Sequence, residues 1–147
     1  MLFAIAANRR ASMYKNIAVP VSFDQDRDVA SAVDVAKCLA DTGARITFLH
    51  VMEIVPAYVV DIIPQQTFSA RTQEIDRRLK ELTDGIENAS AAVIDGAAGR
   101  TITKWASDNG ADCIVIASHR PVMSDILLGS TAAWVVRHAD CAVHVVR

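Results

Sequence analysis

The sequence predicts an α/β fold in which a parallel β-sheet is covered by helices on both faces. Five short apolar runs alternate with longer segments of helical periodicity, which is the pattern of repeated strand–helix–strand units. The runs are apolar almost throughout, as strands are when both sides of a sheet are buried. Hydrophobic residues make up 52% of the 147 and aromatic ones only 5%, which suits thin helices packed closely on a single-domain core.

Each element has a local signal in the sequence. We expect strands over residues 16–21, 45–52, 91–95, 112–117 and 141–146, and helices over residues 26–42, 69–86, 99–109 and 126–138. Gly43 is expected to end the first helix. In the second helix Ile75, Leu79 and Leu82 point inward, and its charged residues, expected to be solvated, include Arg77, Arg78, Lys80 and Glu81.

Residues 53–70 do not fit this alternation. The stretch contains Pro56, Tyr58, Pro64 and Phe68 and has almost no charge. It is too long and too apolar for a plain connector, so we expect it to pack over another part of the molecule.

Charge and cysteine usage exclude several classes of protein. A net charge of −2 and scattered Lys and Arg residues argue against binding to nucleic acid. No apolar run approaches the ~20 residues that span a bilayer, so no membrane partner is expected. Cys38, Cys113 and Cys141 stand far apart in apolar stretches, without the spacing of a disulfide framework or a zinc site. We expect them to be buried free thiols, in a protein of the reducing cytoplasm.

The first twelve residues are not expected to belong to the domain. Residues 1–12 hold an apolar hexad without the basic region that precedes the core of a signal peptide. We therefore expect residues 1–12 to be a disordered or non-native extension and residues 13–147 to form the domain.

The segment ASHRPVMSDILLGST, residues 117–131, suggests an anion-binding turn. Ligands of open parallel sheets bind beyond the carboxyl ends of the strands, where the loops at residues 22–26, 53 onward, 96–99 and 118–130 should meet. A helix N-terminus offers unpaired amides, Gly129 allows close approach, and the Ser130 and Thr131 hydroxyls add donors. Arg120 and His119 could add positive charge. On the other interpretation, Ser130 only caps the helix and Gly129 only turns the chain.

No catalytic or metal-binding set can be assembled from the spacing. The glycine is not followed by the Lys of a P-loop, so the parts of a magnesium-dependent hydrolysis mechanism are missing. His50 and His144 lie on expected strands, and His138 lies near the end of the last helix. Trp105 and Trp134 are expected in the core. We therefore expect no catalytic residue and no metal site.

The last third of the chain, DCIVIASHRPVMSDILLGSTAAWVVRHADCAVHVVR, closely resembles the C-terminal signature of the universal stress protein family. KNIAVPVSFD and FLHVM are similar to the first two strands of that family, so the resemblance covers about Met13 to Arg147. It implies a Rossmann-like, adenine-nucleotide-hydrolase-like sheet of five parallel strands in the order 3-2-1-4-5. It also implies binding of ATP, with AMP, ADP and an accompanying Mg²⁺ ion left open, and a homodimer or higher homo-oligomer.

The resemblance also assigns residues, with two departures. Nucleotide-binding members have Gly, two residues, Gly, nine residues, then Gly-Ser or Gly-Thr; here Ala117 and Arg120 replace the first two glycines, and eight residues precede Gly129. An Asp that usually follows Val-Pro-Val and meets the adenine is Ser22 here. Ser-His-Arg-Pro before Leu-Leu-Gly-Ser nevertheless resembles a subgroup counted with the ATP binders. The implied nucleotide site comprises Pro20, Val21, Ser22, Val51, Ala117, Ser118, His119, Arg120, Gly129, Ser130 and Thr131.

Three functions follow from these observations. The first is an ATP-binding regulatory protein of the stress response. The second is a slow ATPase or phosphotransferase, with His119 or Ser130 handling phosphate, and the third is a nucleotide-free interaction module with a degenerated pocket. Self-association has its own argument: the apolar residues 141–147 form the last strand, and an exposed sheet edge invites pairing with a second copy.

Overall fold

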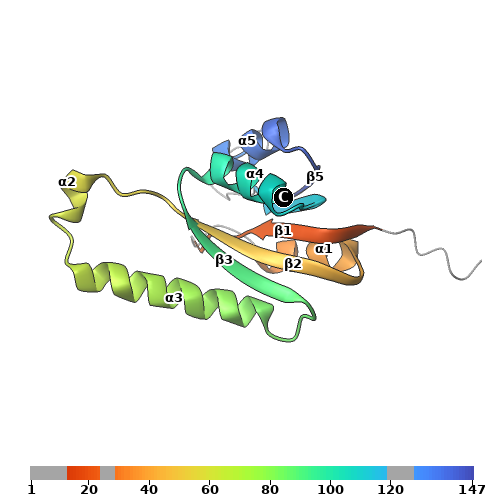
Figure 1. Cartoon of the computed structure of the whole chain (residues 1–147), viewed down its shortest axis with the longest axis horizontal. Coiled ribbons are helices and arrows are strands. Elements are labelled where there is room, and N and C mark those ends of the chain that lie inside the picture. Colours follow the sequence, from red (N-terminus) through yellow and green to blue (C-terminus); the bar gives the residue numbers. More distant parts are fainter. Residues whose placement is uncertain (1–12, 24–28, 119–127) are drawn as a thin grey trace, which may run out of the picture.

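A computed structural model describes residues 13–23, 29–118 and 128–147 and contains one five-stranded parallel sheet in the order β3-β2-β1-β4-β5, with helices on both faces (Figure 1). The predicted fold class and strand order are therefore confirmed. The elements are β1 Tyr14–Pro20, α1 Val29–Leu39, β2 Ala40–Met52, α2 Ala57–Val60, α3 Gln65–Thr83, β3 Ala89–Asp95, α4 Ala98–Asp108, β4 Cys113–Ala117, α5 Ser130–His138 and β5 Ala142–Val146.

The largest boundary error lies between α1 and β2. We expected the helix to continue to residue 42, but it ends at Leu39 and β2 begins at Ala40. Tyr14 pairs with Ala40 and Asn16 with Arg45, so β2 carries an irregularity here, at which Gly43 has a φ of 76°. Residues 40–42, which local sequence signals assign to the helix, therefore belong to the strand. Strand pairing depends on tertiary contacts, which these local signals do not contain.

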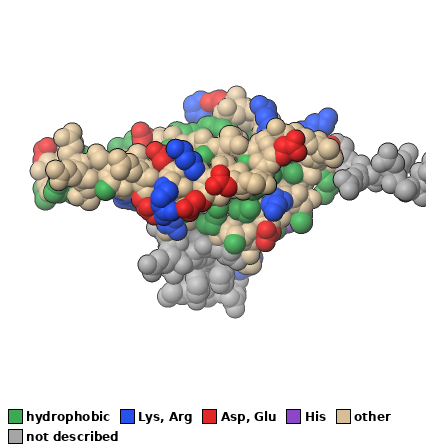
Figure 2. Space-filling view, turned by 90° about the horizontal axis from the view of Figure 1, so that it is seen from below, with side chains coloured by type: hydrophobic (Ala, Val, Ile, Leu, Met, Phe, Trp, Pro, Cys, Tyr) green, Lys and Arg blue, Asp and Glu red, His purple; other side chains and the backbone are tan. Residues whose placement is uncertain are grey.

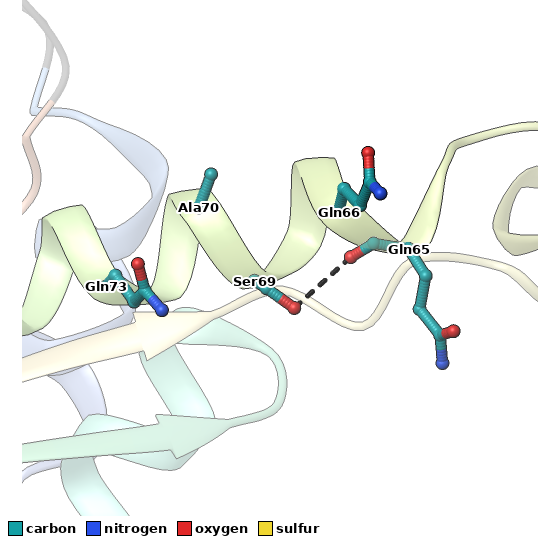
Figure 3. Close-up of a pocket in the computed structure, with 5 residues that line it drawn as sticks. All are labelled: Gln65, Gln66, Ser69, Ala70 and Gln73. Atoms are coloured by element: carbon teal, nitrogen blue, oxygen red, sulfur yellow. Dashed lines mark hydrogen bonds between the residues drawn. The ribbon is translucent and has the colours of Figure 1, made fainter.

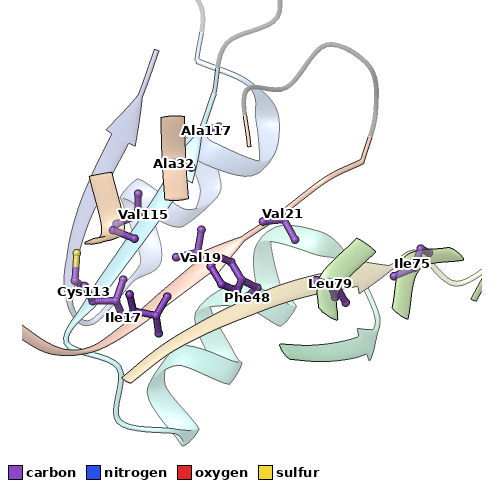
Figure 4. Packing of buried hydrophobic residues seen from close by; sticks show 12 residues of the cluster. Ile17, Val19, Val21, Ala32, Phe48, Ile75, Leu79, Cys113, Val115 and Ala117 are labelled. Atoms are coloured by element: carbon purple, nitrogen blue, oxygen red, sulfur yellow. The ribbon is translucent and has the colours of Figure 1, made fainter. Parts of the chain in front are cut away.

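Two hydrophobic clusters share the sheet, one on each face. Ile17, Val19 and Phe48 pack with α1 and α3 in the first cluster, which Figure 4 shows from close by. Ala18 and Leu49 belong to the second cluster, with α4 and α5. Because successive strand residues point to opposite faces, each central strand contributes to both cores.

The prediction that all three cysteines are buried is wrong for Cys38. Cys113 is buried and Cys141 half-buried, but Cys38 is exposed. Ala32 and Ala36 form the inward side of α1, and the helical period turns residue 38 away from that side. Burial raises the pKa of the Cys113 thiol to about 11 and also raises the pKa of Cys141.

The prediction that residues 53–70 pack over the rest of the chain is also wrong for the described structure. These residues form α2 and the start of α3, and α2 has no buried residue. Ile54, Tyr58 and Ile62 are 75%, 74% and 79% exposed. Figure 1 shows this part projecting beyond the end of the sheet, and hydrophobic side chains are visible at that end in Figure 2.

The helix α3 joins this projection to the sheet. Its buried residues are Ile75 and Leu79, so only its second half packs on the core, while its outer face carries the ion pairs of Arg77 with Glu74 and Glu81. Figure 2 shows positive and negative side chains mixed over this face. Within the described residues, no helix is both long and apolar enough to cross a membrane.

Candidate functional site

The predicted site residues that the structure describes meet at one edge of the sheet. The adjacent strands β1 and β4 lie where the strand order reverses, which is where parallel sheets bind ligands. Pro20 and Ala117 are the last residues of β1 and β4, and residues 21–22 and 118 follow them directly. Val51 lies near the end of β2, and residues 129–131 lie at the start of α5. His119 and Arg120 lie outside the described residues.

Alternation along the strands divides these residues between the two faces. Val21 and Ala117 are 5% and 7% exposed and belong to the cluster under α1 and α3. Val51 packs instead against the cluster under α4 and α5. Pro20 and Ser118 are related by alternation to Ala18 and Ile116 of that second cluster, so they lie on its face. The α4/α5 face therefore carries the side chains that could contact a ligand.

The backbone at the strand ends is partly committed to the sheet. The Val21 N–H donates to the Leu49 carbonyl over 2.8 Å, and the Ser118 N–H donates to the Val146 carbonyl over 2.9 Å. These amides extend the ladders of β1 and β4 and do not face a ligand. Among the described residues, the start of α5 offers further backbone donors at this edge.

The N-terminus of α5 fits an anion. Gly129 is the N-cap residue, no side chain caps the helix, and the first turn has no acidic residue. The Ala133 N–H makes the first helical bond, to the Gly129 carbonyl over 2.8 Å. The amides of residues 130–132 therefore have no partner within the helix, and the helix dipole adds partial positive charge at the same place.

Gly129 keeps the space beside these amides open. A Cβ built on Gly129 would meet only one described atom, the Ser118 carbonyl oxygen, at 3.9 Å. Its φ of −57° is ordinary for any residue. The fold itself therefore does not require glycine here, and a larger side chain would occupy the space in front of the helix.

The α1/α3 face is closed at the same edge by three stacked side chains. The Phe23 and His50 rings lie 5.4 Å apart at an interplanar angle of 25°, and the Arg78 guanidinium lies 4.4 Å from the Phe23 ring centre. His50 Nδ1 is 2.9 Å from the Val21 carbonyl oxygen, so in the tautomer with a proton on Nδ1 it donates there. We expected a solvated Arg78, but it is half-buried in this stack.

A second group of side chains joins α4 to α5 on the open face. A Cβ on Gly99 would lie 2.7 Å from Trp134 Cγ, so only glycine lets the indole pack against the start of α4. The Arg100 guanidinium lies 5.1 Å from the Trp134 ring centre, and His138 stacks on the indole at 3.9 Å. Trp134 is thus half-buried between two helices rather than in the core. No local sequence pattern indicates its contact with Arg100.

Two further features complete the search for a site. The described residues contain no group of three or more His, Cys, Asp or Glu side chains that could hold a metal ion. A hollow of about 400 Å³ lies on α3, lined by Gln65, Gln66, Ser69, Ala70 and Gln73 (Figure 3). One helix forms it from uncharged side chains, far from the ends of β1 and β4, so we place the candidate site at the sheet edge.

Comparison with known proteins identifies relatives along nearly the whole chain. The model of the universal stress protein family matches residues 13–147. Universal stress protein G of Escherichia coli O157:H7 is 31% identical, and the match covers 92% of this chain and all of that protein. The structure of universal stress protein UspA from Lactobacillus plantarum has a TM-score of 0.68 at 25% identity, covering 92% of this chain and 99% of that one. The universal stress protein of Archaeoglobus fulgidus, solved in complex with dAMP, has a TM-score of 0.61 at 17% identity, covering 92% and 99%.

Proposed function

This chain belongs to the universal stress protein family, and we propose that it binds an adenine nucleotide at the carboxyl edge of the sheet, on the α4/α5 face. The observation that carries the proposal is the uncapped N-terminus of α5, which lies beside Gly129 where the strand order reverses. The bound nucleotide would make the protein a cytoplasmic regulatory factor of the stress response, acting through its assembly or its partner contacts.

The two ends of the nucleotide fit different parts of the edge. Phosphate oxygens would accept hydrogen bonds from the amides of residues 130–132 and from the Ser130 and Thr131 hydroxyls. The adenine would lie against Val51, with Ser22 as a hydrogen-bonding residue near the base. The Archaeoglobus fulgidus protein, which has the same fold, was solved in complex with dAMP, and this supports an adenine nucleotide as the ligand. We propose that the nucleotide is ATP and that any Mg²⁺ ion is bound to its phosphates. Arg120 and His119 are proposed as further contacts to the phosphates.

Replacing Gly129 with valine tests the proposal. The fold tolerates a Cβ at this position, so Gly129→Val should keep the thermal unfolding temperature of the parent protein. The valine side chain would fill the space that the phosphate needs, so calorimetric titration with AMP and with ATP should show no binding. Gly129→Ala, with a smaller side chain, should bind both more weakly than the parent does.

The same proteins test whether the site is catalytic. We propose a binding protein rather than an enzyme, so the parent should release no phosphate from ATP above the level of Gly129→Val. Unchanged nucleotide affinity in a folded Gly129→Val protein would contradict the placement of the site. Phosphate release by the parent that Gly129→Val abolishes would favour the slow ATPase instead.

We also propose that the protein forms a homodimer through residues 141–147. The expected edge position of the last strand is confirmed, because β5 is the outer neighbour of β4. Ala142 and His144 are exposed on it and alternate with the half-buried Val143 and Val145. An edge strand of this kind can extend the sheet into a second copy.

A charge on the edge strand tests this dimer. In a two-fold contact His144→Asp brings two carboxylates near each other, so the variant should sediment as a monomer at micromolar concentration, where the parent sediments as a dimer. Gln73→Asp adds the same charge on the exposed face of α3 and should leave the dimer intact. A parent protein that sediments as a monomer would contradict the proposal.

A further inference from the structure

A cation lies beside the open face of the sheet in a place where the local electrostatics disfavour it. Arg100 is in the first turn of α4, which has no acidic residue and no side-chain cap. Arg100 is exposed, and the positive end of the helix dipole disfavours its charge by about 0.3–1 kcal/mol, which an anion bound nearby would offset. The ion pairs among the described residues do not include Arg100; they join Arg77 to Glu74 and Glu81, and Lys104 to Asp108.

The structure holds this cation next to the start of α5. Trp134 lies four residues after Ser130, about 6 Å along the helix axis, and helical side chains lean towards the N-terminus of their helix. Its indole therefore covers the first turn of α5, and the Arg100 guanidinium lies 5.1 Å from the ring centre. Arg100 thus lies against the side chain that covers the first turn of α5, whose uncapped amides we assign to phosphate.

A buried donor marks the same place. The indole N–H of Trp134 is shielded from solvent and has no acceptor among the described residues. Stacking against Arg100 and His138 and close packing on Gly99 hold the ring without that hydrogen bond. A buried N–H without an acceptor is costly. An anion between the starts of α4 and α5 would offer oxygen atoms both to this N–H and to the Arg100 guanidinium.

We infer that Arg100 is a specificity-determining residue that binds the outer phosphates of a nucleoside triphosphate and so favours ATP over AMP. The inference rests on the proposed nucleotide site and adds a contact for the phosphates farthest from the base. The innermost phosphate would lie at the amides of residues 130–132, and the chain of phosphates would extend past Trp134 towards Arg100. AMP, which ends at its first phosphate, would not reach the guanidinium.

Titration of the full chain with AMP, ATP and inorganic tripolyphosphate tests the inference. Arg100→Gln should weaken ATP and tripolyphosphate binding roughly ten- to hundredfold, the loss expected for charge-assisted hydrogen bonds, and should leave AMP affinity within about twofold. Arg100→Lys keeps the charge without the planar fork and should fall between Arg100→Gln and the parent. Lys104→Gln removes the same charge one turn along α4 and should bind all three ligands as the parent does.

The outcomes separate this inference from the proposed function. Equal weakening of AMP and ATP in a folded Arg100→Gln protein, or no weakening of either, would overturn the role of Arg100 and leave the nucleotide site standing. A parent protein that binds neither nucleotide but binds tripolyphosphate through Arg100 would overturn the adenine site and support Arg100 as a polyphosphate contact. A parent that binds none of the three ligands would overturn both.

Discussion

The two faces of the sheet differ most at its carboxyl edge. On the α1/α3 face the edge is closed, because Phe23, His50 and Arg78 stack on one another above Val21. On the α4/α5 face the same strands end below a helix without a cap, next to a glycine whose missing side chain leaves space. The same strands therefore present a packed surface to one side and an open surface to the other.

The difference comes from the helices rather than from the strands. Central strands contribute apolar residues to both clusters in alternation, so they favour neither face. The helix α3 brings an arginine that covers an aromatic ring at the end of β1. The helices α4 and α5 instead pack on each other through Gly99 and Trp134, and the space beside Gly129 at the start of α5 stays open. A ligand is accordingly expected on the face where this space is open.

The largest effect should come from disturbing the contact between α4 and α5. Gly99→Val places a side chain where Trp134 lies, within 2.8 Å of its Cβ and Cγ, and these atoms cannot move without moving α5. Overpacking of this kind costs about 1–3 kcal/mol, so thermal unfolding should occur at a lower temperature. Calorimetric AMP binding should weaken as well, because the start of α5 shifts.

A double-mutant cycle controls this prediction. Trp134→Ala makes room for the new side chain, so the cost of Gly99→Val should be smaller in the Trp134→Ala background than in the parent. Additive costs would show that the two residues do not compete for space. Normal AMP affinity in a destabilised Gly99→Val protein would show that the open face does not depend on this contact.

The smallest effect should come from the closed face. Arg78→Met keeps an unbranched apolar stem of similar length but removes the charge over Phe23, which is worth about 0.5–1 kcal/mol of unfolding free energy. AMP affinity should stay within about twofold of the parent value, because this stack lies on the side of the sheet away from the proposed site. A loss of AMP binding comparable to that of Gly129→Val would extend the site across both faces and remove the contrast between them.

Some features of the site could be predicted from local sequence and some could not. The strand ends and the start of the last helix follow from apolar periodicity and turn residues, so Ser22, Val51 and Gly129 were correctly expected near one edge. The stack of Phe23, His50 and Arg78 could not be predicted, because its members come from three elements that meet only in the folded chain. The contact of Arg100 with Trp134 could not be predicted either, because the two residues lie on different helices.

The sequence by itself determined the α/β class, the five strands and, through its resemblance to a family, the order in which they lie. Apolar residues recur with a period of two in strands and of 3.6 in helices, and this pattern is a local property of the sequence that does not depend on tertiary contacts. Only the tertiary structure decided which face stays open, that Cys38 is exposed, and that Tyr58 and its neighbours project from the body. These features depend on which helix covers which part of the sheet, and that is set by packing between residues far apart in the chain.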